Sequence, residues 1–368
     1  VLLSHGLVLP VYGGDEGMFV YFVAIVQFFF GTGIWQVIAT SAALGTATIL
    51  TTYLAVKEIL GRQIAFLTAF LLTVSSWHIA LSRDGFRAIL VPLLVTLFLY
   101  ALGRAWHAAT DKQHYIRYAI AAALFALGVY TYYAYVLFAL AMGVIAIIFA
   151  LTHRKKLMQF LSDNKQPLLL ALLVFLVVLA PIAIYILLYP AEYFSRVGQV
   201  SIFAQAHTLG DRAAVLYQNA KATIGGIFTT GDLNWRHNAS GHPLLAFILV
   251  PFFVVACGYA LYKRGIYLAV LFLSVVMCLP AIMTNDGVPP HGLRLIGTIP
   301  FLFLLPAIPL SWLLSLSSKV AKLAGTAIVS SVLIFVAWQG YQNYFGEAPY
   351  QAHYYYDYRC DLTALTSY

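Results

Sequence analysis

Charged residues are scarce in this sequence. Only 9% of the 368 residues are Asp, Glu, Lys or Arg, and 62% are hydrophobic, whereas soluble domains carry about 25% charged residues. A chain of this length cannot bury so much apolar surface in one core. The apolar residues also lie in runs of about fifteen to twenty-five. The composition therefore excludes a soluble enzyme and indicates a protein that crosses a lipid bilayer several times.

Several motifs that carry chemistry in other proteins are absent. The three cysteines form no CxxC pair, so neither a cysteine metal site nor a disulfide framework is expected. The sequence has no Walker A loop and no GxGxxG, HExxH or GxSxG motif, which leaves nucleotide-driven chemistry unsupported. The formal net charge is +8. In a membrane protein the positions of such charges report topology, and no nucleic-acid partner is expected.

About ten apolar runs are long enough to form membrane helices. They lie at residues 34–56, 63–82, 88–103, 117–131, 134–152, 167–189, 243–262, 266–283, 295–315 and 323–338. None shows the alternation of a membrane β-strand, so we predict an all-α polytopic membrane protein of about ten transmembrane helices. Only two tyrosines separate the fourth and fifth runs. We interpret these two runs as a hairpin, with one long or broken helix as the alternative.

The distribution of charge orients these helices. The loop at residues 153–165 is the most basic connector, and the positive-inside rule places it in the cytoplasm. Alternation from this loop gives the inner connectors thirteen cations and three acids, and the outer connectors eight cations and ten acids. The inner face then carries +10 and the outer face −2. We therefore predict a multi-pass protein of the plasma (inner) membrane whose long polar connectors, and any active site, are extracytoplasmic.

Two more helices are predicted on the outer membrane surface. Residues 18–30 are apolar, but a helix of that length spans only about 20 Å. Residues 209–228, within a long outer loop at 191–242, have an amphipathic pattern. The predicted organisation is one transmembrane domain, residues 1–338, in which residues 1–33 are the remnant of a first outer loop. Residues 339–368 form an outer tail.

Paired acids precede the first of these surface helices. Asp15 and Glu16 stand in the sequence GGDEG. Carboxylates favour the positive end of a helix, so capping is one interpretation. The other is functional, because a carboxylate at the membrane surface can act as a general base on an acceptor hydroxyl or hold a divalent cation. The sequence shows no clean set of metal ligands, and the identity of any cofactor stays open.

Arginines stand at the mouths of two outer turns. Arg83 and Arg87 flank Asp84 and are four residues apart, so they share one face if the turn is helical. Arg294 follows His291 at the start of an apolar run, where an unpaired arginine costs about 2–3 kcal/mol. A phosphate would satisfy these guanidinium groups. We predict that the three arginines converge on one cavity, with headgroup anchoring as the alternative.

The long outer loop ends in a second polar group. Trp235, Arg236 and His237 are typical of residues that contact a sugar or a lipid headgroup, although a solvated loop with an aromatic anchor is an equal alternative. The tyrosines of the YTYYAY segment near residue 132 fit an aromatic belt at the membrane surface, or secondarily a carbohydrate platform.

The order of these segments resembles the GT-C superfamily of polytopic glycosyltransferases, specifically bacterial family-39-like enzymes of the protein mannosyltransferase or aminoarabinose transferase type. The matching stretches are GGDEGMFVYFVAIVQFFFG, LTVSSWHIALSRDGFRAILVPL, LGVYTYYAYVL, GDLNWRHNASGHPLL and PPHGLRLIGTIP. The resemblance implies a polyprenyl-phosphate sugar donor and transfer, with inversion, to an acceptor glycan, lipid or protein on the extracytoplasmic face.

The resemblance also implies roles for particular residues. In the family the principal catalytic acid lies early in the first outer loop, after a first membrane helix, and this sequence shows neither that helix nor the start of that loop. We expect Asp15 and Glu16 to match the later part of the loop. The 83–87 turn matches the one that the family places beside the donor phosphate. Two other functions stay open at this point: a non-catalytic transporter or flippase of lipid-linked saccharide, and a structural subunit of a membrane complex.

Overall fold

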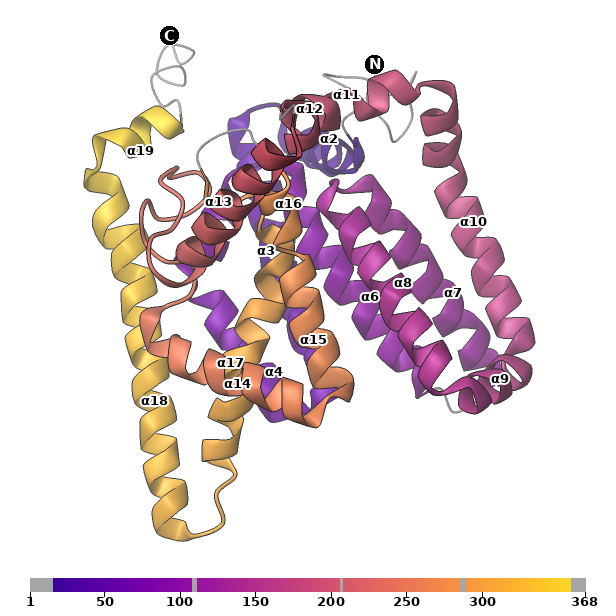
Figure 1. The fold of residues 1–368 in the computed structure, drawn as a ribbon. Coiled ribbons are helices and arrows are strands. Elements are labelled where there is room, and N and C mark those ends of the chain that lie inside the picture. Colours follow the sequence, from indigo (N-terminus) through magenta and orange to yellow (C-terminus); the bar gives the residue numbers. More distant parts are fainter. Residues whose placement is uncertain (1–15, 108–110, 206–207, 285–288, 359–368) are drawn as a thin grey trace.

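A computed structural model describes residues 16–107, 111–205, 208–284 and 289–358. Within these ranges the regular structure is helical. Ser201 and Thr284 form an isolated antiparallel β-bridge, and the described residues form no β-sheet. The helices stand side by side as a bundle, with further helices lying across one of its ends (Figure 1). The predicted all-α polytopic class is therefore confirmed.

Each of the ten predicted apolar runs is helical, but fewer than ten meet the requirements for a membrane span. In the part of the chain that the structure describes, seven helices are long and apolar enough to cross a bilayer. They are Ile34–Leu60 (α3), Arg87–Trp106 (η1 and α6), Ala134–Thr152 (α8), Lys165–Leu188 (α10), Gly265–Ile282 (α15 and α16), Ile296–Leu314 (η4 and α17) and Lys319–Tyr350 (α18, η5 and η6). An eighth is a bent pair, Arg62–Thr73 (α4) and Ser76–Arg83 (α5), with a 63° angle between its halves.

The remaining two runs are shorter helices, which corrects the count of about ten spans to seven or eight. Helix α7, Asp111–Leu127, has 17 residues and begins with charged ones. Helix α14, Val250–Lys263, has 14 residues. The predicted hairpin is confirmed, because η2 (Gly128–Tyr130) and a short turn connect α7 to α8, and Phe125 of α7 packs against Tyr135 and Phe138 of α8.

The connectors separate into two ends of the bundle. Helices α2 (Met18–Phe30), α11 (Pro190–Val200), α12 (Ile202–Gln205), α13 (Leu209–Phe228) and α19 (Ala352–Asp357) gather at one end, which we call the loop end (Figure 1). Basic α9 (Arg154–Asp163) and the α17–α18 connection lie at the other. The predicted grouping of connectors is therefore present. The assignment of the loop end to the outer side of a membrane stays a prediction.

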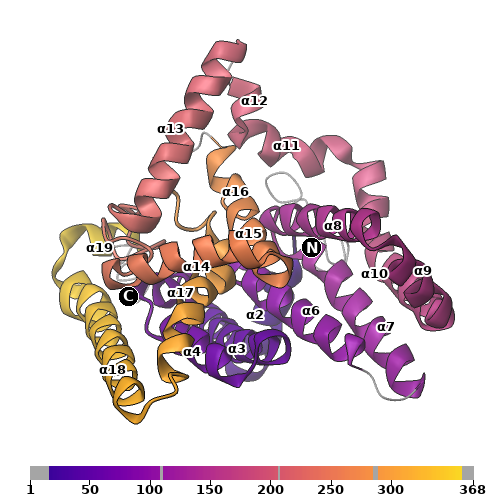
Figure 2. The ribbon, with the colours of Figure 1, turned by 60° about the horizontal axis from the view of Figure 1, so that its bottom comes forward.

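Helix α17, Ile299–Leu314, is the centre of the packing. Thirteen consecutive residues from Ile299 to Ser311 are buried, and α17 lies between α14 and α4 (Figure 2). Helix α10 is its opposite, with exposed apolar side chains such as Leu172 and Val177 along most of its length. An apolar helix that is buried on all sides is a core helix, whereas one exposed along its length fits a lipid environment.

Close contact between α3 and α5 fixes the start of the site. The Ser75 hydroxyl accepts a hydrogen bond from the backbone N–H of His78 and so caps α5. His78 Nε2 lies 3.1 Å from the Gly45 carbonyl oxygen of α3. A Cβ atom at Gly45 would lie 2.1 Å from Ser82 Oγ, so only glycine lets the helices come this close. The turn after α5, which begins at Arg83, is thereby anchored to α3.

The long loop after α12 begins with the predicted amphipathic helix. Helix α13 has the predicted bounds of 209–228, and Thr208 and Asp211 form a capping box at its start. Asn219 Nδ2 donates to the carbonyl oxygens of Ile282 and Thr284 at 3.1 and 2.9 Å. These bonds hold α13 against α16, Leu279–Ile282. Its position on a membrane surface stays a prediction.

Candidate functional site

A cavity of about 410 Å³ opens at the loop end, and we call it the basic cavity. Three of its lining residues are arginines, Arg87, Arg236 and Arg294, and Asp84 is the one carboxylate. The side facing α8, α11 and α16 is apolar and includes Leu137, Val197, Val200 and Met283. A wall that is cationic on one side and apolar on the other suits an amphipathic anion.

Glu16 supports Arg87 from behind this wall. The Arg87 Nε–H donates to Glu16 Oε2 at 3.1 Å, and the Glu16 side chain is only 1% exposed. Helix α2 begins after Gly17 without a side-chain cap, so the capping interpretation of Glu16 is wrong. Glu16 is also not among the cavity's lining residues. It therefore orients an arginine across 71 positions of sequence, and Asp15 lies outside the described residues.

Asp84 and Arg236 form a second pair in the wall of the basic cavity. The Arg236 Nε–H donates to Asp84 Oδ1 at 2.7 Å. The Asp84 side chain is 1% exposed and that of Arg236 41%, so the guanidinium keeps one side open. The second carboxylate oxygen of Asp84 is buried and has no hydrogen-bond partner among the described residues.

Arg294 and Tyr132 complete the cationic side. Arg294 is 7% exposed and lies near the Tyr132 hydroxyl, which Arg87 also approaches. Burial raises the pKa of Tyr132, and the two arginines offset part of that rise. Tyr132 therefore stays a neutral hydrogen-bonding group at physiological pH. Of its neighbours, Tyr133 also lines the cavity, whereas Tyr130 and Tyr135 are fully buried in the core and belong to neither an aromatic belt nor a sugar platform.

Arg83 does not join the other two arginines, which corrects the expectation of one set made of Arg83, Arg87 and Arg294. Its Nη1 donates to Tyr354 Oη at 2.7 Å and to Tyr344 Oη at 3.3 Å. Both tyrosines come from the segment after α18, which the sequence predicted only as an outer tail. Arg83 therefore holds that segment by hydrogen bonds. The third arginine in the wall of the basic cavity is Arg236.

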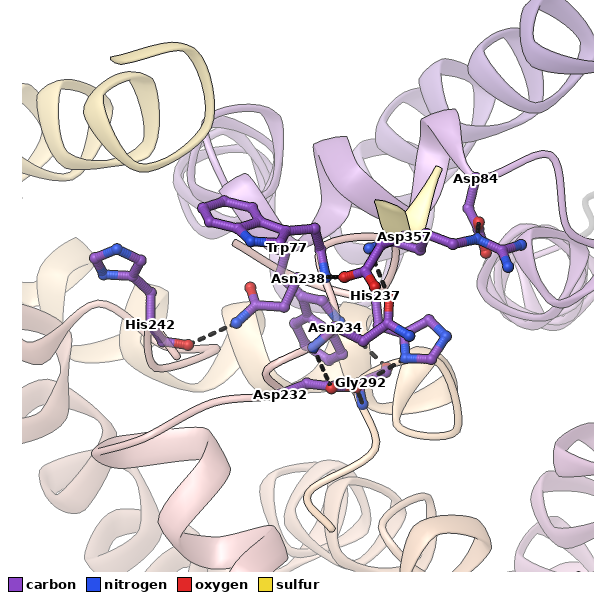
Figure 3. A network of polar contacts seen from close by, with 11 residues as sticks. Trp77, Asp84, Asp232, Asn234, His237, Asn238, His242, Gly292 and Asp357 are labelled. Carbon is purple, nitrogen blue, oxygen red and sulfur yellow. Dashed lines mark hydrogen bonds and ion pairs between the residues drawn. The ribbon is translucent and has the colours of Figure 1, made fainter. Parts of the chain in front are cut away.

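The loop at 231–242 folds around a buried carboxylate, Asp232. Asp232 Oδ1 accepts from the Asn234 backbone N–H at 2.9 Å, and Oδ2 accepts from Gly292 N–H at 2.7 Å. His237 Nδ1 lies 2.9 Å from Oδ2 (Figure 3). His237 also stacks on His291, with ring centroids 4.5 Å apart. Asp232 therefore joins two segments that are about 60 residues apart in sequence.

Asp232, His237 and His291 are the described residues that can hold a metal ion. Each offers a ligand atom, and these atoms lie within 4.8 Å of one another. Asp232 is 5% exposed. This cluster was not predicted from the sequence, because its members come from two separate loops. A motif scan tests only ligands at fixed spacing within one segment.

A second cavity, of about 620 Å³, lies beside the first. We call it the acidic cavity, because among the described residues its lining carries the carboxylates of Asp232, Glu347 and Asp357 and no lysine or arginine. His237 and His291 line both cavities and so form their shared wall.

Trp235 lies on the acidic side of this wall. It lines the acidic cavity but is only 4% exposed, because it packs edge-on against Tyr354. Its backbone N–H donates to Asp357 Oδ2 at 2.8 Å. A direct contact between Trp235 and a substrate stays a prediction.

Comparison with known proteins agrees with this architecture. Residues 17–185 match the family model described as dolichyl-phosphate-mannose-protein mannosyltransferase. The chain has a GT-C fold. The resemblance inferred from the sequence motifs is therefore confirmed at the level of fold. No curated protein sequence matches the chain.

Solved structures share this fold at low sequence identity. ArnT from Cupriavidus metallidurans bound to undecaprenyl phosphate matches 86% of this chain with a TM-score of 0.56 and 16% identity. The apo form of that protein matches 90% with a TM-score of 0.60 and 14% identity. The archaeal oligosaccharyltransferase AglB from Archaeoglobus fulgidus, in complex with an inhibitory peptide and a dolichol-phosphate, matches 92% with a TM-score of 0.55 and 16% identity. The chain spans 53%, 66% and 49% of those three chains.

Proposed function

We propose that this protein is a membrane glycosyltransferase that moves a sugar from a polyprenyl-phosphate donor to an acceptor on the extracytoplasmic face. The observation that carries the proposal is the basic cavity, in which Arg87, Arg236 and Arg294 face an apolar wall. Two proteins of the same fold were solved with undecaprenyl phosphate and with a dolichol-phosphate. Their ligands have the amphipathic anionic character that this cavity suits.

The donor phosphate would bind against the arginines. Glycosyl transfer breaks the bond between the sugar C1 and a phosphate oxygen, and negative charge accumulates on the departing phosphate. Arg87 and Arg294 are mostly buried, so their charges act in a medium of low dielectric constant and stabilise that phosphate more than surface residues would. The ion pair with Glu16 holds Arg87 in place before the phosphate arrives.

The acceptor would enter from the acidic cavity. Its hydroxyl or amine must lose a proton as it attacks C1 from the face opposite the phosphate, which inverts the configuration. Asp84 lines the basic cavity and would hold the Arg236 guanidinium there for the sugar phosphate. Asp15 stays the proposed catalytic carboxylate of the first outer loop. Glu16 is placed to position Arg87, since it contacts that residue and does not line the cavity.

Binding of undecaprenyl phosphate to the purified full-length protein in nanodiscs tests the proposal. We expect saturable binding that weakens when Arg294 is replaced by alanine and is unchanged in Arg212→Ala, a substitution in α13 away from the cavity. Equal binding by wild type and Arg294→Ala would contradict the proposed donor site. A carrier would bind the same lipid but release no sugar, so turnover of a polyprenyl-phosphate sugar separates the enzyme from the transporter.

A further inference from the structure

The shared wall between the two cavities carries a group of ligands that the glycosyl transfer described above does not use. Asp232 and His237 come from the loop after α13, and His291 comes from the segment before η4, Ile296–Thr298. Their ligand atoms lie within 4.8 Å of one another. Long-range packing brings them together, since the Trp77 indole N–H of α5 donates to the Gly292 carbonyl oxygen at 3.2 Å and holds the second segment in place.

The carboxylate is already oriented. Backbone N–H groups of Asn234 and Gly292 fix the two oxygens of Asp232 at 2.9 and 2.7 Å. Both are main-chain donors, so they constrain the direction of the carboxylate without placing a competing positive charge on it. Hydrogen bonds of this kind around a ligand fix its geometry and are typical of metal sites. Asp232 is also 5% exposed, so this orientation is maintained away from bulk water.

The spacing suits a shared cation. Asp232 Oδ2 and His237 Nδ1 are 2.9 Å apart, and two ligand atoms that each lie about 2.0–2.2 Å from one tetrahedral zinc ion are about 3.3–3.6 Å apart, so a shift of about half an ångström would admit the ion. When His237 Nδ1 carries a proton, it donates to Oδ2. In the tautomer that carries its proton on Nε2 instead, the Nδ1 lone pair and a lone pair of Oδ2 can coordinate a metal ion.

The donor set selects the type of ion. Two imidazole nitrogens and one carboxylate oxygen are the ligands of open zinc sites, whereas Mg²⁺ and Ca²⁺ prefer oxygen alone. The side of the cluster toward the acidic cavity also carries the carboxylates of Glu347 and Asp357, which favours a cation. On the other side, the nearest arginine in sequence, Arg236, is paired with Asp84.

We propose that Asp232, His237 and His291 bind one Zn²⁺ ion in the wall shared by the two cavities. Three protein ligands leave a fourth position open, and a ligand entering from either cavity can reach it because His237 and His291 line both. This assignment does not depend on the proposed function. A zinc ion at this place is compatible with a glycosyltransferase, a carrier or a structural protein.

Zinc binding by the purified full-length protein tests the proposal. After removal of metal with EDTA, ZnCl₂ alone is titrated into the protein in nanodiscs, and the bound zinc is measured by inductively coupled plasma mass spectrometry. We expect one Zn²⁺ per chain, and at least a tenfold loss of affinity in His291→Gln and in Asp232→Asn. His353→Gln is the matched control, because His353 lines the acidic cavity outside the cluster, and it should bind zinc like wild type.

Two further measurements keep the test independent of folding and of the proposed function. Metal-free wild type and His291→Gln should melt at the same temperature. Co²⁺ bound to wild type should give a visible absorption spectrum typical of nitrogen and oxygen ligands, and His291→Gln should lose this spectrum. Unchanged zinc affinity in both ligand variants, no stoichiometric zinc in wild type, or equal affinity for Mg²⁺ would overturn the assignment. Undecaprenyl-phosphate binding, measured on the same samples, reports separately on the donor site.

Discussion

The two cavities of the loop end share a wall but differ in charge. Among the described residues, the basic cavity is lined by three arginines and one carboxylate, and the acidic cavity by three carboxylates and no arginine or lysine. The two cavities therefore offer adjacent binding environments of opposite sign. Under the proposed function, an anionic lipid donor would be attracted to the first and repelled by the second.

The cavities also differ in how they are built. The basic cavity is assembled on the ends of membrane helices, with Arg87 beside η1 and Arg294 just before η4. The acidic cavity is assembled from a loop and the segment after α18, which meet through contacts such as His242 with Glu347 at 2.7 Å. Groups held by packed helices are positioned more rigidly than groups held by loops. We therefore expect substitutions to be more costly in the basic cavity.

The largest effect is expected from removal of a guanidinium in the basic cavity. Arg294→Ala should lower the turnover of a polyprenyl-phosphate sugar about 10²–10³-fold, because a charge that stabilises the departing phosphate is lost. Arg294→Lys should recover only part of the rate, since lysine lacks the bidentate fork. Arg83→Ala is the informative contrast, because Arg83 contacts the tyrosines of the C-terminal segment instead of the cavity. A larger loss in Arg83→Ala than in Arg294→Ala would contradict the assignment of the cavity.

A smaller effect is expected from Asp84→Asn. This substitution keeps the shape of the side chain but removes the charge that orients Arg236. Turnover should fall on the order of 10–100-fold, while affinity for undecaprenyl phosphate stays equal or rises. Kinetic constants and lipid binding measured on the same variant check this, and a loss confined to lipid affinity would argue against a role in transfer.

Gly45→Val should change the thermal stability of the protein more than its turnover. The new side chain meets Ser82 on α5, and overpacking of this kind costs about 1–3 kcal/mol. We expect a lower melting temperature and a displaced 83–87 turn. Gly143→Val is the matched control, since a Cβ atom at Gly143 in α8 meets nothing within 4 Å. Equal melting of the two variants would show that the α3–α5 contact does not fix the turn.

The smallest effect is expected in Glu347→Gln, at the rim of the acidic cavity. Glu347 and its partner His242 are 43% and 30% exposed, and exposed ion pairs contribute about 0–1 kcal/mol. Thermal melting and turnover should both stay close to wild type. A large loss of turnover with unchanged melting would instead place Glu347 in contact with the acceptor and sharpen the role of this cavity.

Much of the fold was predictable because it depends on local patterns. The apolar run at 18–30 and the amphipathic run at 209–228 give helices with those bounds. The span count was too high because α7 begins with charged residues and α14 has only 14. Neither fact is visible when a run is judged by its apolar part alone.

The site was predictable only in part, because its residues meet through tertiary contacts. Arg87, Asp84, His291 and Arg294 stood out as charged or polar residues at helix ends, and they do line one cavity. Asp232 gave no comparable signal, since its role depends on bonds to residues five and sixty positions away.

The errors for Arg83 and Glu16 have the same origin. Their partners, Tyr354 and Arg87, are 271 and 71 positions away. Sequence spacing therefore offered no way to exclude a role for either residue in the cavity.

The central claim is that the donor phosphate binds in the basic cavity. A cryo-EM structure of the full-length protein in nanodiscs with undecaprenyl phosphate tests this most directly. The account predicts density for the phosphate within hydrogen-bonding distance of Arg87, Arg236 and Arg294, with the lipid chain along the apolar wall formed by α8 and α11. Phosphate density in the acidic cavity, or on Arg83 outside both cavities, would contradict it.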